Sequence, residues 1–218
     1  LLDGLGEWSI VGFLLLGLSG VAVVAANLTA PAMRASIAGF IAGLMIWRGF
    51  IDGPLRFFSE YFAIAPIDFG GYPLAGRYVL LMSTVTIMVA LLFLYGLMNR
   101  ETKCVFMRYL MKLVRWSPGL PTQGVQRSIA RIAAMETVFV QWAIFLLFLY
   151  LGDWLGNPFY LVMLLWSVYL VVQLFRRKRA SDVFRYAIPV SVVIWSLAEV
   201  GAFFRLYPEF WQSPAENP

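Results

Sequence analysis

Long apolar stretches alternate with short polar ones along this chain. Six of the apolar stretches approach the roughly 20 residues that a helix needs to cross about 30 Å of hydrocarbon. They lie near 8–28, 32–51, 77–98, 137–155, 158–175 and 186–207. The pattern predicts an all-α fold: a polytopic integral membrane bundle of about six transmembrane helices, in which residues 1–218 form a single transmembrane domain.

The segment 52–76, between the second and third predicted spans, has a helical pattern of its own. Pro54 suits the first turn of a helix. Apolar residues follow it at helical spacing, namely Leu55, Phe58, Tyr61, Phe62 and Ala65. We therefore expect a short helix lying in the outer membrane interface. Residues 66–73, which contain two prolines and two glycines, are expected to form an irregular turn into the third span.

The segment 99–136 is the most polar part of the chain. Its cations include Lys103, Arg108, Lys112 and Arg115, and the last three recur at i, i+4 and i+7. This spacing predicts a basic amphipathic helix on the cytoplasmic side, which either lies on anionic lipid or docks on a partner protein. Thr122 is a suitable N-cap for the next helix, which should run unbroken from the cytosol into the fourth span.

Charge indicates the orientation of the spans. Thirteen of the 17 Lys and Arg residues fall in three short stretches, around Arg34, over 100–131 and over 176–185. Because basic loops stay on the cytoplasmic side, the expected path has both termini outside, most simply in a bacterial inner membrane. The net charge of +5 is then explained by topology and anionic inner-leaflet lipid rather than by nucleic acid.

Composition removes several kinds of function. The spans occupy well over half of the 218 residues, which leaves no room for a large soluble catalytic domain. The chain has no histidine and a single cysteine, Cys104, so the usual ligands of haem, zinc and copper and any intrachain disulfide are missing. No phosphate loop or nucleophile motif occurs either. We expect a protein that is not an enzyme and has no cofactor.

Small residues in the second span indicate close helix packing. Ala35, Gly39 and Gly43 recur every four residues and form one ridge, which lets another helix backbone approach closely. The glycines of the first span, such as Gly17 and Gly20, make that span the expected partner. A contact between subunits is the alternative.

Glu199 is the strongest candidate for a functional group. It lies slightly outward of the middle of the last predicted span, where a carboxylate costs at least roughly 2–3 kcal/mol unless it is paired, protonated or hydrated. It either binds a proton or cation or fixes helix packing. Arg48 lies within reach as a partner, although Asp52, one turn along the same helix, is the easier partner for Arg48.

Two hypotheses of different classes follow. In the first, the chain is a non-catalytic membrane subunit of a larger secretion, transfer or energy-transducing complex, whose partners are other membrane proteins. In the second, it is a small transporter or channel that uses Glu199 as its proton- or cation-coupling group. The second hypothesis needs more polar groups facing Glu199, and the available set is Ser83, Thr84, Thr86, Gln141 and Ser196.

Overall fold

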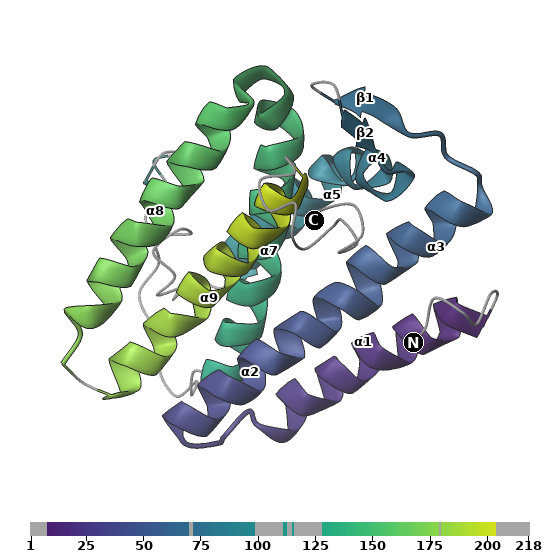
Figure 1. Cartoon of the computed structure of the whole chain (residues 1–218). Coiled ribbons are helices and arrows are strands. Elements are labelled where there is room, and N and C mark those ends of the chain that lie inside the picture. The colour runs from purple at the N-terminus through teal and green to yellow at the C-terminus, as the bar shows by residue number, and fades with distance from the viewer. Residues whose placement is uncertain are drawn as a thin grey trace, which may run out of the picture.

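The chain is described here by a computed structural model that covers residues 8–69, 72–98, 111–112, 115, 128–178 and 180–203. This part of the protein is almost entirely helical (Figure 1). Its elements are α1 (Ser9–Ala26), α2 (Ala32–Ile46), the π-helix η2 (Trp47–Asp52), α3 (Gly53–Tyr61), β1 (Ile67–Phe69), β2 (Tyr72–Leu74), α4 (Gly76–Ser83), α5 (Val85–Met98), α7 (Ile129–Leu155), α8 (Asn157–Phe175) and α9 (Ala180–Phe203).

Several helices are long and apolar enough to cross a membrane, as an integral membrane protein requires. Four pass this test within the described residues, and α4 and α5 make a fifth if the bent pair counts as one span. The last predicted span corresponds to α9, whose apolar stretch Tyr186–Gly201 is shorter than the others. The structure thus supports four or five of the six expected spans by length and composition.

The outer helix expected after the second span differs from the prediction. The residues 53–61 are helical, but α2, η2 and α3 form one continuous helix of 30 residues, Ala32–Tyr61, rather than a span and a separate interfacial helix. At about 1.5 Å per residue this helix is about 45 Å long. Pro54 has no N–H to give to the preceding turn. The wide turns of η2 come directly before it and let the helix continue past the proline.

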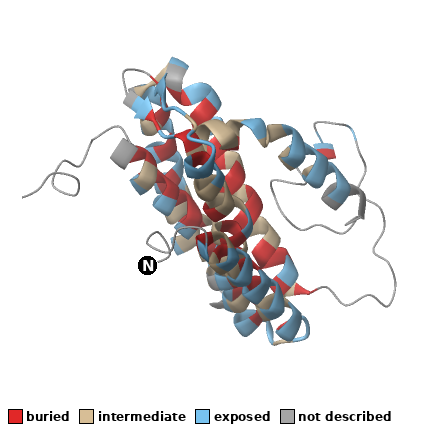
Figure 2. Cartoon of the chain, turned by 90° about the vertical axis from the view of Figure 1, so that its right-hand side faces the viewer, coloured by how far each residue is buried: buried red, intermediate tan, exposed pale blue. Residues whose placement is uncertain are grey.

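Helix α7 lies at the centre of the bundle. It packs against α2, α8, α9 and α4, and most of its residues are buried. The buried residues run along the middle of the helix bundle, and the outer faces of the helices are exposed (Figure 2). As expected, α7 is unbroken over its length, but its N-cap is Ser128, whose hydroxyl accepts a hydrogen bond from the Arg131 N–H at 3.3 Å. Thr122 therefore does not cap this helix.

The small-residue ridge of α2 makes an internal contact, but not with the first span. A Cβ atom added at Gly43 would lie 2.6 Å from the Thr137 Cβ and 2.9 Å from the Ala134 carbonyl oxygen, both on α7. One added at Gly39 would meet Ala133 of α7. The prediction of α1 as the partner of this ridge was wrong. Residue spacing identifies a face of a helix, but it does not identify the helix that packs against that face.

Helix α1 packs on another face of the same long helix. A Cβ atom at Gly20 would lie 2.8 Å from the Ala42 carbonyl oxygen, and one at Gly17 would meet the Phe50 ring. Gly49 in turn approaches the backbone of Gly17. The glycines of α1 therefore do support close packing, on α2 and η2, through residues outside the ridge.

A small β-hairpin covers one end of the bundle. Strands β1 and β2 pair antiparallel, with Asp68 opposite Pro73, where an irregular turn was expected. Phe69 and Leu74 are buried, and the Phe69 ring packs on Phe148 of α7 at a centroid distance of 5.4 Å. The hairpin fixes the chain as it enters α4, the element that carries Arg77.

Candidate functional site

Among the described residues, three side-chain oxygens are buried in the bundle without a hydrogen-bond partner. They are Gln141 Oε1 on α7 and Ser196 Oγ and Glu199 Oε2 on α9. The helices α7 and α9 pack against each other, and Ser196 and Glu199 are one turn apart on the same face of α9. Buried polar groups in proteins are nearly always hydrogen-bonded. Three unpartnered oxygens on one helix pair are therefore candidates to bind a proton, an ion or water.

Charged groups from two further elements act on the Glu199 carboxyl. Arg48 and Asp52 of η2 and Arg77 of α4 are its electrostatic neighbours, and a side-chain hydrogen bond links it to Trp195, one turn earlier. The fold therefore brings together residues that are more than 100 positions apart in the sequence. Four charged side chains from three elements form what we call the charge cluster, defined as Arg48, Asp52, Arg77 and Glu199.

The predicted pairing of Arg48 with Asp52 is confirmed. The Arg48 Nη1 atom donates to Asp52 Oδ2 in an ion pair one turn apart along η2. Both side chains are partly open to solvent, at 40% and 23% exposure. The Arg48 guanidinium also lies 5.5 Å from the centroid of the Phe13 ring on α1. Arg48 is thus close to Glu199, but its direct partner is Asp52.

The π-helix explains how Arg48 and Asp52 reach this position. A π-helix has one more residue per turn than an α-helix and rotates the side chains that follow it, and such turns are frequent at functional sites. Trp47, the first residue of η2, is buried and stacks on Phe145 of α7 with a centroid distance of 5.8 Å and a 9° interplanar angle. This anchor holds the wide turn against the centre of the bundle.

Arg77 and Tyr78 form the second half of the cluster. The Arg77 Nη2 atom donates a hydrogen bond of 2.8 Å to the Tyr78 hydroxyl oxygen, and the guanidinium carbon lies 4.6 Å from the centroid of the same ring. Tyr78 also stacks on Phe145, with centroids 6.2 Å apart. Tyr78 and Trp47 therefore pack against the same α7 side chain, one from α4 and one from η2.

The third span is bent beside this site. α4 and α5 meet at Thr84 at an angle of 43°. The Thr84 hydroxyl donates to the Leu81 carbonyl oxygen at 2.7 Å and accepts a hydrogen bond of 2.9 Å from the indole nitrogen of Trp142 on α7. Trp142 is the neighbour of Gln141 in the sequence and is itself buried. The bend is thus tied by a hydrogen bond to the helix that carries one of the unpartnered oxygens.

The structure brings some of the predicted site residues near Glu199 and leaves others elsewhere or undescribed. Arg48 lies among the charged neighbours of Glu199, Ser196 is one turn from Glu199 on α9, and Gln141 lies on α7, which packs against α9. Of the cations expected on the cytoplasmic side, Lys112 and Arg115 are exposed. Lys103 and Arg108 lie outside the described residues, so the amphipathic helix itself stays a prediction.

Arg77, Tyr78 and Trp142 were missed as site residues. Arg77 is the first residue of the third predicted span, where a lone cation is normally interpreted as a flanking charge. A cation followed at once by an aromatic residue at the start of a span was the available signal.

The unpartnered oxygens determine which chemistry this part of the bundle offers. Over the described ranges no group of three or more Cys, Asp or Glu side chains could hold a metal ion. The unpartnered oxygens instead belong to a carboxyl, an amide and a hydroxyl, groups that exchange hydrogen bonds with a proton, a cation or water. No family model, curated protein or solved structure matches this chain. Function therefore has to be argued from the site.

Proposed function

We propose that this protein is a small membrane transporter in which Glu199 is the coupling group and binds a proton or a monovalent cation. The observation that carries the proposal is the buried Glu199 Oε2, which has no hydrogen-bond partner and lies one turn from the equally unpartnered Ser196 Oγ on α9, the helix that packs against the helix of Gln141. Ionisable groups within membrane segments are expensive and mark ion pathways or proton relays by default. The unpartnered oxygens of Ser196 and Gln141 belong to the same helix pair as the carboxyl and are the groups that a relay would use.

Two departures from regular helix support the proposal. Transporters commonly build their sites from discontinuous helices, because irregular backbone at membrane depth is tolerated where it lines a cavity or is buried in protein. The π-helix η2 supplies Arg48 and Asp52, and the bend lies at Thr84, less than two helical turns after Tyr78. The irregular backbone of this protein is thus next to its charged side chains.

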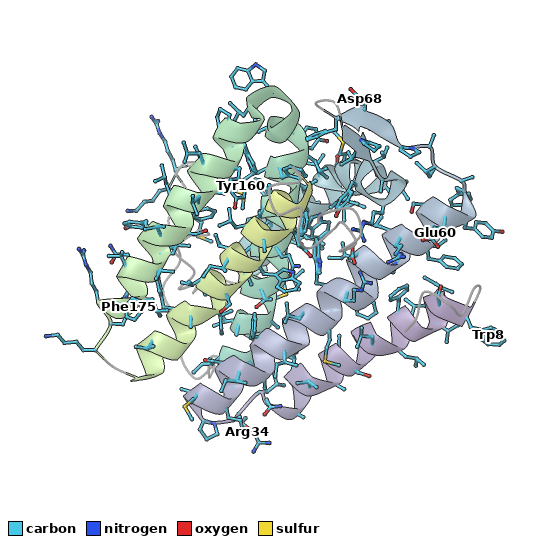
Figure 3. All side chains as sticks on the ribbon, in the orientation of Figure 1. Trp8, Arg34, Glu60, Asp68, Tyr160 and Phe175 are labelled. Carbon is cyan, nitrogen blue, oxygen red and sulfur yellow. The ribbon has the colours of Figure 1, made fainter. Side chains whose placement is uncertain are left out.

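The proposal includes a topology with six crossings and both termini outside, in a bacterial inner membrane. Arg34 and Phe175, which precedes the basic run Arg176–Lys178, lie toward one end of the bundle (Figure 3). Glu60 and Asp68 lie toward the other end (Figure 3). Basic residues gather on the cytoplasmic side of membrane proteins, which makes the first end the inner one. The charge cluster then lies in the outer half, near the start of α4.

The test is proton movement in vesicles. The full chain is reconstituted into liposomes with an entrapped pH-sensitive dye, with the membrane voltage clamped, and receives pulses of sodium, potassium, lactate or phosphate salts. We expect one of these pulses to change the internal pH with the wild-type protein. Glu199→Gln, which keeps the size of the side chain but cannot ionise, should reduce that rate to the level of protein-free vesicles. Glu60→Gln, on an exposed and remote glutamate, is the matched control and should behave as wild type.

Two results would contradict the proposal. One is a Glu199→Gln protein that moves protons at the wild-type rate. The other is a wild-type protein, folded and inserted, that moves no protons under any of the four pulses.

A second function is favoured by one observation on α5. This helix leans away from the rest of the bundle (Figure 2), and its side chains are mostly exposed, among them Ile87, Val89 and Leu91. A helix that packs so little against the other helices of its own chain is typical of a membrane subunit that contacts a partner in a larger assembly. The mass of the particle purified gently from its native membrane tests this function: other proteins at fixed stoichiometry would support it, and a lone monomer or homo-oligomer would exclude it.

A further inference from the structure

Arg77 and Tyr78 offer hydrogen-bond donors that no acidic side chain uses. Among the residues that the structure describes, the ion pairs are Arg48–Asp52 and Arg56–Glu60, and neither includes Arg77. The one hydrogen bond that Arg77 donates goes to the neutral Tyr78 hydroxyl. Because that oxygen acts as an acceptor there, its own hydrogen remains available for a further acceptor. The pair thus forms a small, half-buried donor site at the start of α4.

The charges of the cluster give this site a switch. Arg48 and Asp52 form an ion pair, and Asp52 also acts on Arg77, ahead of Glu199. With Glu199 ionised, the two arginines and the two acids of the cluster carry no net charge. When Glu199 takes up a proton, the cluster has one net positive charge, which Arg48 and Arg77 share around Asp52. A partly buried excess of positive charge is unfavourable, so protonation of Glu199 raises the affinity of the cluster for an anion.

The donor geometry selects the kind of anion. Guanidinium presents two parallel N–H groups that match the two oxygens of a carboxylate, and this pairing is both stronger and more specific than a point-charge contact. The Tyr78 O–H adds a third donor. The Tyr78 ring is held in place by stacking on Phe145, which keeps its hydroxyl beside Arg77. One net positive charge matches an anion with one negative charge.

We infer that the cargo of this protein is a singly charged carboxylate anion, which Arg77 and Tyr78 bind when Glu199 is protonated. The inference rests on the function proposed above, since it requires Glu199 to be the proton-binding group. One proton on Glu199 and one anion on Arg77 cross together, so no net charge moves. Transport is therefore electroneutral and indifferent to the membrane voltage.

Glu199 is the group expected to take up the proton, because the other groups around it are either paired with each other or carry no acidic proton in this range. From η2 the charged groups are Arg48 and Asp52, which are paired with each other, and α4 adds the charged Arg77 and the neutral Tyr78. The buried face of α7 near Gln141 adds Thr137, which is uncharged. Tyr160 of α8 packs partly buried against the same core, and the ridge of α2 is formed by alanine and glycine.

Anion binding can be measured through the tryptophans of the site. Trp47 stacks on Phe145, the residue on which Tyr78 also stacks, so the tryptophan fluorescence of the purified full chain should respond to an anion at Arg77. Acetate and chloride are titrated separately, at mildly acidic pH, where acetate remains ionised, and at alkaline pH. We expect acetate to bind wild type about tenfold or more tightly at the acidic pH, as expected for one opposing charge nearby. Chloride should bind more weakly than acetate.

Variants assign the effect to residues. Glu199→Gln should bind acetate at both pH values as tightly as wild type does at acidic pH. Arg77→Gln should lose about tenfold or more in affinity at acidic pH. Tyr78→Phe keeps the ring and its stacking and should weaken acetate binding by a few-fold. This variant tests the site if Arg77→Gln fails to fold. Arg34→Gln, on an exposed arginine toward the opposite end of the bundle from Glu60 and Asp68 (Figure 3), is the control and should bind as wild type.

The outcomes separate this inference from the proposed function. Equal affinities for acetate and chloride, or unchanged acetate binding by Arg77→Gln, overturn the carboxylate inference alone. The same holds if sodium or potassium, rather than lactate, drives proton movement that Glu199→Gln abolishes in the vesicle experiment. A pH dependence of acetate binding that survives in Glu199→Gln shows that another group titrates, and it overturns both.

Discussion

The contact between α2 and α7 and the contact between α7 and α9 differ in whether their buried polar groups are hydrogen-bonded. Thr137 of α7, which lies against Gly43 of α2, donates its hydroxyl to the Ala133 carbonyl oxygen at 2.8 Å, and the buried Ser36 of α2 donates to the Ala32 carbonyl oxygen at 2.8 Å. Ser196 of α9 is also buried within a helix, yet it makes no such bond. Ser36 and Ser196 are the same residue type, so serine chemistry does not explain the difference. We attribute the α2–α7 contact to packing, and we expect the unpartnered groups of the α7–α9 contact to serve transport.

Overpacking the ridge of α2 should have the largest effect on stability. In Gly43→Ala the new Cβ would lie 2.6 Å from the Thr137 Cβ, closer than real Cβ contacts allow, so α2 and α7 must move apart. We expect a loss of about 1–3 kcal/mol in the free energy of unfolding, despite the better helix propensity of alanine. Thermal unfolding in detergent measures it.

The control for this variant is Ala22→Val on the exposed face of α1, which should unfold with wild-type stability. An equal loss in both variants would show that the ridge is not a tight contact.

Replacing an unpartnered oxygen should separate stability from transport. Gln141→Leu removes the buried Oε1 acceptor and fills a similar volume. We expect the stability to be unchanged or to rise by up to about 1 kcal/mol, because the desolvation cost of an unsatisfied group disappears. Proton movement in vesicles should fall by about tenfold, roughly what removing one positioned polar group costs. A destabilised protein with normal transport would show that Gln141 has only a structural role.

The smallest effect is expected at the satisfied serine of α2. Ser36→Ala removes a hydrogen bond within one helix, and such bonds in membrane proteins contribute about 0.6 kcal/mol on average. Transport should be unaffected, because Ser36 lies one turn from Gly39 of the packing ridge and is not part of the charge cluster. A transport defect in this variant would show that the packing contact of α2 and the α7–α9 contact do not differ in their role in transport.

The sequence predicted the helices better than it predicted their neighbours. Hydropathy located the apolar helices, and i, i+4 spacing correctly paired Arg48 with Asp52. The prediction that α1 covers the Gly39–Gly43 ridge was wrong, because several helices have small residues that could pack there. The continuity of α2 through Pro54 was missed because proline normally ends or begins a helix, and a π-helix leaves no clear signature in the residues.

The site was predicted in part for similar reasons. Glu199 stood out because a carboxylate within an apolar stretch is rare and costly. Gln141 and Ser196 were named only as members of a polar set, since their burial without partners depends on how α7 and α9 face each other. Arg77 lies more than 100 residues from Glu199 in the sequence, and only the folded chain brings their charges into range.

The most direct test of the central claim is to observe the Glu199 proton itself. Infrared difference spectra between acidic and alkaline pH, recorded on the full chain in lipid, report the carbonyl stretch of protonated carboxylic acids. We predict a band in wild type that is present in the Glu60→Gln control and absent in Glu199→Gln. The same band in Glu199→Gln, or no difference between wild type and that variant, would contradict the claim that Glu199 takes up the proton.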